Sequence, residues 1–381
     1  MKKIIRVTTI PASLKVLLKG QLRFINQYYE VIGVSGDGEA LKEVRENEGI
    51  RTEVVEMTRT ISPIKDLVAT YKLYRLLKEE KPHIVHTHTP KAGIVGMLAA
   101  KLAGVKHRFH TVAGMPLLVV KGPKRTLLNM VEKATYAFAT KVFPNSYGLY
   151  DIILEEGFTK KEKLSVIGKG SSNGINIDHF DSNLYSEQDI NTLKKQLNIK
   201  DNEFIFTFVG RLVTDKGINE LVSAFDIFSK QHKDSKLVLV GWRENDLDPL
   251  LPKTEEALKN NKHIIQVGYQ PDVRPYFAIS QALVFPSYRE GFPNVVLQAG
   301  AMDIPSIVTN INGCNEIIKH GENGLIIPTH DAQAIVDAMC YLKENPEIHR
   351  IMSANSRKII ASNYRHTYIW NELLKEYQKT D

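Results

Sequence analysis

Cysteine and long apolar runs, two features that would fix the class of a protein at once, are scarce in this chain. Only Cys314 and Cys340 occur among 381 residues, which excludes a disulfide-rich secreted scaffold and a four-cysteine zinc site. No apolar run approaches the roughly 18 residues that a membrane-spanning helix needs. The basic start, residues 1–7, is too short for a signal-peptide core and is interrupted by Arg6. We therefore expect a first buried strand and a cytoplasmic location.

Charge is distributed unevenly along the chain. The net charge is +7, but residues 1–180 carry +11 and residues 181–381 carry −4. This contrast and the length indicate two domains with different partners. A basic first half suits nucleic acid, an anionic membrane surface or a phosphorylated substrate, and it equally suits a solvated surface rich in lysine.

Short apolar runs rich in β-branched residues alternate with helical patterns throughout. We expect strands at 4–9, 31–35, 52–56, 83–87, 108–112, 141–144, 204–209, 236–240, 264–267, 282–285, 306–309 and 325–327. Helical patterns lie at 13–27, 62–81, 93–102, 217–231, 331–342 and from 346 to about 377. This alternation predicts βαβ units and parallel sheets with helices on both faces.

A cluster of glycine, serine and asparagine at 168–176, followed by a polar stretch to 189, marks a domain boundary. We predict a first domain over 1–172 and a second over 173–360, both doubly wound α/β domains. In such sheets ligands bind beyond the carboxyl ends of the strands, so we expect a site in a cleft between the domains.

The sequence GRLVTDKG, from Gly210 to Gly217, follows a predicted strand and opens a predicted helix. Gly210 permits close approach of the backbone, and the start of a helix supplies partial positive charge. Arg211 and Lys216 add two full positive charges on either side of the turn. The pattern favours a site for an anionic diphosphate over the alternative, two solvated loop cations.

A second cluster, PSYREGFPNVVLQA, covers residues 286–299. Glu290 lies on the loop before a helix that we expect to begin near Asn294, and its carboxylate can accept hydrogen bonds from hydroxyl groups. Gln298 lies eight positions later and can face the same pocket, beside the free N–H groups of the helix start. Such polar groups suit a sugar or a ribose. The alternative is a glutamate that favours the helix dipole and an exposed glutamine.

In this order, and about 80 residues apart, the two clusters resemble the hallmarks of the group 1 family of retaining glycosyltransferases. The resemblance implies an α/β GT-B fold with two Rossmann-like domains facing across a cleft. It further implies transfer of a hexose or N-acetylhexosamine from a UDP-sugar to a polyprenyl-diphosphate-linked saccharide in capsule, O-antigen or exopolysaccharide assembly. No metal, cofactor or nucleic acid is implied, and the chain has no Asp-x-Asp signal. Segment 361–381 is expected to pack back on the first domain as a helix.

The resemblance also assigns residues. It implies catalytic roles for His110, Arg211, Lys216 and Glu290, and donor binding by Ser13, Gly210, Tyr269, Phe292, Pro293, Asn294, Val295 and Gln298. Two departures from the family stand out. Gln298 replaces the usual glutamate that binds the ribose, and the first loop, residues 9–13, lacks the usual glycines, although Ser13 suits an N-cap.

Histidines at the ends of two predicted strands are candidates for a pocket in the first domain. His110 occupies the place of the family's active-site histidine, and the alternative is a buried, hydrogen-bonded structural residue. His86 and His88 share one face of a strand, but no third metal ligand is evident nearby. With Lys91 they are candidates for lining the acceptor site.

Two stretches combine basic and apolar residues. Lys15, Lys19 and Arg23 form a stripe on the first helix, which suits either anionic lipid or an ordinary solvated face. The apolar run 115–120 with Lys121, followed by Lys124 and Arg125, predicts docking on the inner face of the membrane.

Two rival functions use the same fold. The first is a UDP-sugar 2-epimerase, which would need acid and base carboxylates and no acceptor, and the two clusters speak against it. The second is a non-catalytic binder of nucleotide sugars, in which Gln298 in place of the usual glutamate would reflect the loss of catalytic activity. Retention of Arg211, Lys216 and Glu290 argues against that reading.

Overall fold

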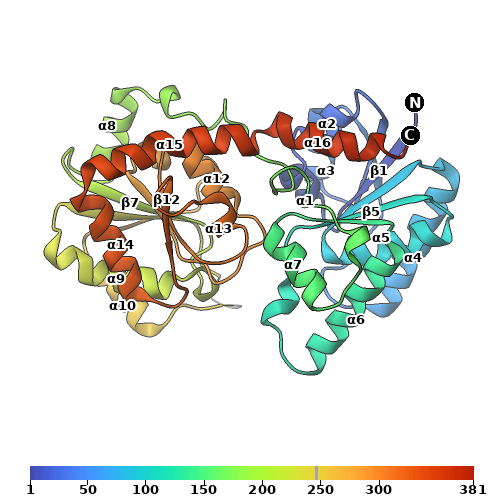
Figure 1. Ribbon diagram of the computed structural model, residues 1–381, viewed down its shortest axis with the longest axis horizontal. Helices are drawn as coiled ribbons and strands as arrows, with labels where there is room; N and C mark the ends of the chain where they lie inside the picture. The colour runs from blue at the N-terminus through green and yellow to red at the C-terminus, as the bar shows by residue number, and fades with distance from the viewer. Residues whose placement is uncertain (245–247) are drawn as a thin grey trace. The chain divides into compact units, whose positions relative to one another are not determined.

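A computed structural model describes residues 1–244 and 248–381 (Figure 1). The chain divides into two compact units. Unit 1 comprises Met1–Gly174 together with His366–Asp381, and unit 2 comprises Ile175–Arg365. The division therefore falls two residues after the predicted boundary. Within the described ranges, no helix combines the length and the apolar character needed to cross a membrane.

Unit 1 is built on a six-stranded parallel sheet in the order β3-β2-β1-β4-β5-β6. The strands are β1 (Lys3–Val7), β2 (Glu30–Ser35), β3 (Arg51–Val54), β4 (Ile84–His88), β5 (His107–Val112) and β6 (Lys141–Pro144). The helices are α1 (Pro11–Leu17), α2 (Gln21–Ile25), α3 (Glu39–Glu48), α4 (Pro63–Glu80), α5 (Pro90–Leu102), η1 (Pro116–Val119), α6 (Pro123–Phe138), α7 (Tyr147–Glu155), η2 (Lys161–Lys163) and α16 (His366–Gln378).

Unit 2 is built on a second six-stranded parallel sheet, in the order β12-β11-β10-β7-β8-β9. The strands are β7 (Phe204–Val209), β8 (Ser235–Val240), β9 (Ile264–Gly268), β10 (Ala282–Phe285), β11 (Ser306–Thr309) and β12 (Gly324–Ile327). The helices are η3 (Ser182–Leu184), α8 (Glu187–Gln196), η4 (Thr214–Lys216), α9 (Ile218–Gln231), α10 (Pro252–Asn260), α11 (Arg274–Ala278), α12 (Asn294–Ala301), α13 (Cys314–Ile317), α14 (Ala332–Glu344) and α15 (Pro346–Tyr364).

Both sheets have the strand order of the Rossmann fold. Counted from the first strand of each unit, the order is 3-2-1-4-5-6 in both, and the predicted α/β class is confirmed. The order reverses between β1 and β4 in unit 1 and between β7 and β10 in unit 2. Ligands of such sheets bind at this reversal, outside the carboxyl ends of the two strands.

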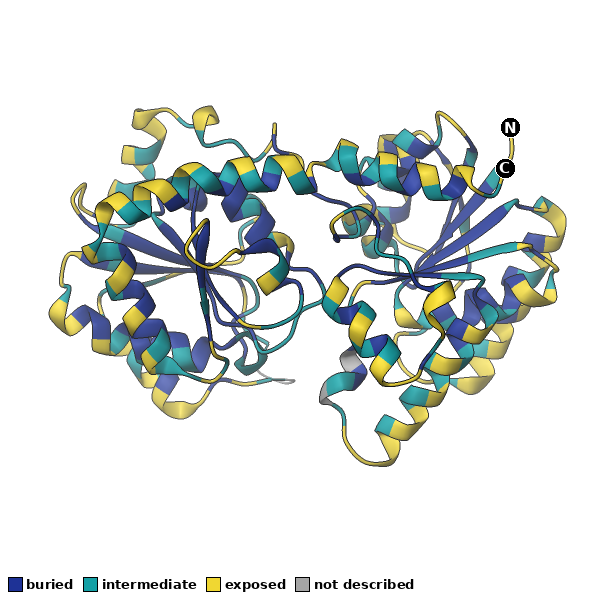
Figure 2. Cartoon of the chain, viewed as in Figure 1, coloured by how far each residue is buried: buried dark blue, intermediate teal, exposed yellow. Residues whose placement is uncertain are grey.

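The central strands are buried on both faces because helices cover each sheet (Figure 2). β4 and β10 are buried at every residue. A strand of this kind reads as a continuous apolar run rather than an alternating one. That property holds for β10, with the sequence ALVF, but not for β3 or β4, which contain polar residues. Every predicted strand nevertheless coincides with an observed one to within two residues at each end.

Two predicted helices are each divided in the structure. The helix expected over 13–27 is divided into α1 and α2 because Gly20 adopts a left-handed conformation, with φ of 78°. A Cβ on Gly20 would lie 2.7 Å from the indole ring of Trp370. The helix expected from 346 to 377 stops at Tyr364, because Arg365 leaves the helical region with ψ of 139°.

Helix α16 completes the core of unit 1. Tyr377 is fully buried, and its hydroxyl lies 2.6 Å from Nδ1 of His86. The indole N–H of Trp370 donates to the side-chain oxygen of Asn173 over 2.6 Å. The last helix is therefore joined to unit 1 by hydrogen bonds as well as by apolar packing.

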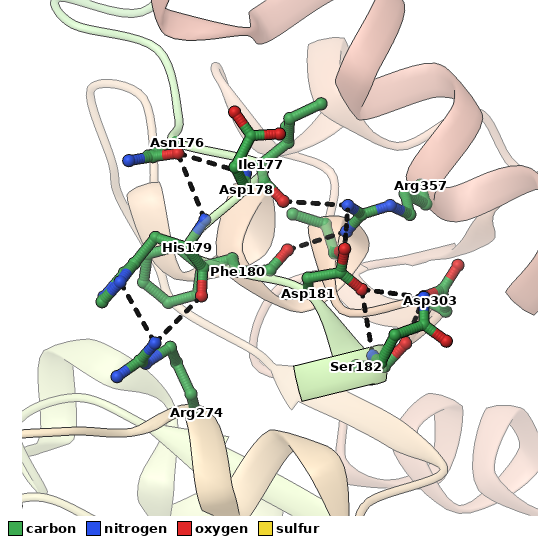
Figure 3. Close-up of polar contacts among 12 residues, drawn as sticks. Asn176, Ile177, Asp178, His179, Phe180, Asp181, Ser182, Arg274, Asp303 and Arg357 are labelled. Carbon is green, nitrogen blue, oxygen red and sulfur yellow. Dashed lines mark hydrogen bonds and ion pairs between the residues drawn. The ribbon is translucent and has the colours of Figure 1, made fainter. Parts of the chain in front are cut away.

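The segment at the start of unit 2, residues 176–182, is fixed by side chains from elsewhere in that unit (Figure 3). Arg274 donates to the carbonyl of His179 over 3.1 Å. Arg357 on α15 donates over 2.8–2.9 Å to three oxygen acceptors of the segment, which belong to Ile177, Phe180 and Asp181. These bonds hold an otherwise irregular stretch against the body of unit 2.

Candidate active site

Two loops meet at the reversal of strand order in unit 2. One follows β7 and runs from Gly210 to Gly217, and the other follows β10 and covers residues 286–293. Gly217 has φ of +69°, and a Cβ there would lie 2.1 Å from the carbonyl oxygen of Pro286. Only glycine permits this approach. The backbones of the two loops are therefore in direct contact.

Polar contacts fix this junction. The N–H of Tyr288 donates to the carbonyl of Asp215 over 3.0 Å, and the guanidinium of Arg289 pairs with the Asp215 carboxylate at 2.8 Å. The buried hydroxyl of Ser287 donates to the carbonyl of Arg289 over 3.2 Å. From β11, the Thr309 hydroxyl donates to the carbonyl of Ser287. The second loop therefore has little freedom to change shape.

Lys216 and Glu290 form an ion pair across this junction, Nζ to Oε1. The Lys216 ammonium also lies 5.5 Å from the centre of the Phe285 ring. Both side chains of the ion pair retain about 15% of their exposure, 16% and 15% respectively. A ligand can therefore reach the pair and separate it, placing an anion on the lysine and hydroxyl groups on the carboxylate.

A third loop, after β11, contacts the backbone at Glu290 and Gly291. The side-chain amide of Asn312 donates to the carbonyl of Glu290. A Cβ on Gly313 would lie 2.5 Å from the carbonyl oxygen of Gly291. The family resemblance includes Asn312 and Gly313 at the expected places, but it assigned neither residue a role in the site; an asparagine followed by a glycine is typical of a tight turn.

Arg211 lies at the start of the loop that follows β7. Its guanidinium pairs with Glu244, and both side chains are partly exposed. The N–H of Leu212 donates to the carbonyl of Trp242 over 2.8 Å. The exposed ring of Tyr269 contacts that of Trp242, with centroids 5.6 Å apart and planes at 69°. The residues that follow β7, β8 and β9 therefore include a partly exposed cation and two exposed aromatic rings.

Helix α12 begins at Asn294 on the same edge of the sheet. The first N–H groups of any helix lack intrahelical acceptors, and Pro293 at the N-cap contributes no side-chain bond to them. Phe292 is buried against Tyr364, with centroids 5.4 Å apart. Gln298 is half-buried, and its amide has no hydrogen-bond partner among residues 1–244 and 248–381.

His110, in unit 1, is buried. Its Nδ1 lies 2.8 Å from the hydroxyl of Thr87, and a Cβ on Gly93 would lie 2.6 Å from its Cε1. Burial lowers the pKa of His110 to about 4, so the ring is neutral at pH 7. These contacts are those of a buried structural histidine.

His86 and His88 are also buried and lie in contact, with ring centroids 4.3 Å apart. Both nitrogens of His86 are engaged, Nδ1 with Tyr377 at 2.6 Å and Nε2 with Thr111 at 2.7 Å. Nε2 of His88 accepts from Arg6 over 3.0 Å. Burial, and after it the positive charge of Arg6, lower the pKa of His88 far below its usual value. Both histidines line a small buried cavity together with Gln21 and Thr111, and their expected role at the acceptor stays a prediction.

Arg6 was missed by sequence analysis as a functional candidate. It is fully buried on β1, and its Nη2 donates to the side-chain oxygen of Gln21 over 2.6 Å. Its Nη1 has no hydrogen-bond partner within the described part of the chain. Gln21 in turn donates to Asn173 over 3.1 Å. The available signal was a single arginine inside an apolar strand, which we interpreted only as an interruption.

Three of the remaining candidates in unit 1 are engaged in ion pairs or helical structure. Lys91 pairs with Asp66 at 2.5 Å, and Arg125 pairs with Glu156 at 2.7 Å. Ser13 is not an N-cap, because α1 begins two residues earlier, at Pro11. Lys121 and Lys124 are exposed.

The predicted membrane-docking run 115–120 is wrong for two of its apolar side chains. Met115 and Leu117 are buried in the core of unit 1, so neither can enter a bilayer. On the first helix, Lys15 pairs with Glu43 at 2.5 Å. Burial of Met115 and Leu117 is therefore at odds with the apolar docking run predicted over 115–120, whereas the stripe on the first helix stays open between anionic lipid and a solvated face.

Comparison with known proteins identifies the same two halves. Residues 28–170 match the family described as "Glycosyl transferase 4-like domain", and residues 189–359 match "Glycosyl transferases group 1".

Two relatives match this chain across both units. The capsular polysaccharide biosynthesis glycosyltransferase CapM of Staphylococcus aureus is 32% identical over 99% of this chain and 97% of its own. The UDP-Gal:alpha-D-GlcNAc-diphosphoundecaprenol alpha-1,3-galactosyltransferase of Escherichia coli is 34% identical over 82% and 79%. Among solved structures, Anabaena HepE in complex with UDP superposes with a TM-score of 0.83 at 18% identity, over 100% of both chains.

Proposed function

This chain belongs to the group 1 glycosyltransferases and has their GT-B fold, and on that premise we propose that it transfers a hexose or N-acetylhexosamine from a UDP-sugar, with retention of configuration, to a lipid-linked saccharide in surface polysaccharide assembly. The names of two relatives support the proposed donor, acceptor and pathway. The S. aureus relative is named for capsular polysaccharide biosynthesis. The E. coli relative is named for a UDP-sugar donor and a diphosphoundecaprenol-linked acceptor.

The observation that carries the proposal is the Lys216–Glu290 pair at the β7 and β10 strand ends. On donor binding, Lys216 exchanges Glu290 for the diphosphate, and Arg211 exchanges Glu244 for it. The two cations then stabilise the charge that develops on the departing phosphate in the transition state. Glu290, released from Lys216, accepts hydrogen bonds from hydroxyl groups of the donor sugar.

The remaining donor contacts follow from position. The free N–H groups of Asn294 and Val295 face the anionic or polar part of the donor. Gln298 binds the ribose hydroxyls with its side-chain amide, and Tyr269 contacts the base. No residue is assigned as a nucleophile. In the front-face scheme that the family suggests, the leaving phosphate assists deprotonation of the acceptor hydroxyl.

Two roles in unit 1 are revised. We place His110 as a positioning residue, because its ring supports Thr87 at the end of β4 and Gly93 in α5. Among the basic candidates, exposed Lys121 and Lys124 are the ones available to an acceptor diphosphate.

The decisive experiment is nucleotide release from a panel of UDP-sugars, with and without a polyprenyl-diphosphate-linked sugar. Acceptor-dependent release from one donor is expected, with the product bond of the same anomeric configuration as the donor. Lys216→Ala and Arg211→Ala should each lower kcat about 100-fold or more. Lys253→Ala and Arg350→Ala alter exposed residues of the same unit and should have no effect.

Other outcomes contradict specific parts of the proposal. Conversion of a UDP-sugar without an acceptor would identify an epimerase. Nucleotide binding without turnover on any acceptor would identify a binder. Full activity of Lys216→Ala would remove the ion pair from the mechanism.

A further inference from the structure

Helix α4 of unit 1 has two apolar faces on opposite sides. One face packs into the core, where Ala69, Leu73 and Leu77 are buried. The other carries a second set of large apolar side chains at positions i, i+3, i+4 and i+7, all exposed. We call this set the α4 stripe, and it consists of Ile64 (80% exposed), Leu67 (67%), Val68 (50%) and Tyr71 (61%).

The stripe is continuous. Residues three and four apart in a helix are neighbours on its surface, so the four side chains of the stripe lie side by side. Ile61, just before the helix, is exposed as well. Single exposed apolar residues are ordinary, whereas a contiguous apolar patch rimmed by polar residues marks an interaction surface. Figure 2 shows the exposed positions along α4.

The charges around the stripe are of one sign. Four exposed cations lie close to it in the sequence: Arg59, Lys65, Lys72 and Arg75. The segment 59–78 contains one carboxylate, Asp66, and this carboxylate is paired with Lys91. An apolar face with such flanks is complementary to a bilayer with anionic headgroups, because aliphatic stems reach the acyl boundary while cations contact phosphates.

The position of the stripe in the fold agrees with this interpretation. α4 leads into a strand of a parallel sheet, so its first turns lie at the carboxyl edge of that sheet (Figure 1). α6 also begins at this edge, and it exposes Leu127 and Met130 near Lys124 and Lys133. The edge at which ligands of such sheets bind is therefore also the apolar and basic edge of unit 1.

We propose that the α4 stripe and its four flanking cations dock the enzyme on an anionic lipid bilayer. The proposal rests on the proposed function, in that a lipid-linked acceptor is met at that surface. It replaces residues 115–120, whose apolar side chains Met115 and Leu117 are buried, as the apolar contact with the membrane.

The test is co-sedimentation of the full-length protein with phosphatidylcholine vesicles that contain or lack phosphatidylglycerol. Wild-type protein should bind the anionic vesicles and should be released by high salt. The triple variant Ile64→Ser, Leu67→Ser, Tyr71→Ser should lose binding about tenfold or more, because it removes apolar area that enters the bilayer. The double variant Lys72→Gln, Arg75→Gln should lose about 30-fold, through two charges near the surface.

A matched control carries the same chemical change elsewhere. Ile351→Ser, Leu184→Ser, Tyr341→Ser removes an isoleucine, a leucine and a tyrosine that are exposed on unit 2, and it should bind vesicles like the wild type. Far-ultraviolet circular dichroism and thermal unfolding confirm that all variants remain folded.

Vesicle binding separates this proposal from the proposed function, because it needs no turnover. Wild-type protein that ignores anionic vesicles, or a stripe variant that binds like the control, would overturn the docking surface. A wild-type dimer that the stripe variant dissociates in light scattering would also overturn it, because the stripe would then join two copies of the chain. Vesicle binding without transferase activity would leave docking intact and refute the function alone.

Discussion

Substitution of Gly217 by alanine probes how the two loops of the donor site are held together. An alanine at φ of +69° pays a backbone cost of about 1 kcal/mol. Its Cβ would also lie 2.1 Å from the carbonyl oxygen of Pro286, whereas ordinary contact begins near 3.4 Å. The loops must therefore separate by about 1 Å. With strain and lost contacts together we expect a destabilisation of unit 2 of about 3 kcal/mol.

Gly321→Ala is the matched control. Gly321 also has a positive φ, +82°, but a Cβ there would meet nothing within 4 Å. It should therefore lose only the backbone term, about 1 kcal/mol. At 2–4 °C per kcal/mol for a unit of this size, calorimetry should show Tm falling by about 9 °C for Gly217→Ala and about 3 °C for Gly321→Ala.

Activity gives a second readout. A shift of about 1 Å between Lys216 and Glu290 should lower kcat/KM roughly 100-fold, and Gly321→Ala should leave it unchanged. The reasoning is refuted if Gly217→Ala melts no lower than Gly321→Ala, or if it keeps wild-type kcat/KM.

Three further predictions concern single side chains. Gln298→Glu should leave the fold intact and change the Kd for UDP, because a carboxylate accepts ribose hydrogen bonds without donating any; an unchanged Kd in calorimetric titration excludes the ribose assignment. Burial lowers the pKa of His110 to about 4, against about 6.5 when unfolded, so the unfolded state binds the extra proton and stability falls as the pH drops from about 6.5 toward 4. Between pH 7 and about pH 4.5, the free energy of unfolding measured by chemical denaturation should fall by about 2–3 kcal/mol less in His110→Gln than in the wild type. An unaltered pH profile would disprove the burial argument. Tyr377→Phe removes the hydroxyl beside Nδ1 of buried His86 and should cost about 1–3 kcal/mol in the same assay; wild-type stability would mean that this bond contributes nothing.

The strands were predictable because their physical cause is local. Segment 204–209 is apolar except for Thr207, and β7 is buried at all but its first residue. Helix α3 was not predicted, because only Leu41, Val44 and Glu48 are buried in it. Two apolar contacts in ten residues leave too weak a helical period to detect. The break at Gly20 depends on Trp370, which is 350 residues away in sequence.

The donor site was partly predictable for a similar reason. Lys216 and Glu290 each follow a strand, and adjacent parallel strands bring their ends together, so the sequence placed both at one edge. It did not reveal that Glu244 pairs with Arg211, or that Asn312 supports Glu290. Those contacts come from loops whose shape is set by tertiary packing.

Buried polar residues mark the limit of such inference. His110 and Arg6 both lie on strands, and a polar residue at a strand end faces either a ligand or a hydrogen-bond partner inside the fold. Here Thr87 and His88 supply the partners. The sequence contains both residues of each pair, but it does not show that adjacent strands bring them into contact.

The predicted membrane contact at 115–120 and the proposed one on α4 show why an apolar pattern alone does not locate a surface. Residues 115–120 and helix α4 both combine apolar and basic residues. In the first, Met115 and Leu117 fill the core. In the second, Leu67 and Tyr71, which belong to the helical pattern predicted over 62–81, are exposed, because the core is already filled by the opposite face of α4. The helical spacing of apolar residues shows that one face of the helix is apolar. Whether that face is core or surface depends on what packs against it. Of the two, the α4 face is the exposed one, and its four flanking cations have no ion-pair partner within residues 1–244 and 248–381. It is therefore the face from which lipid binding should be lost on mutation.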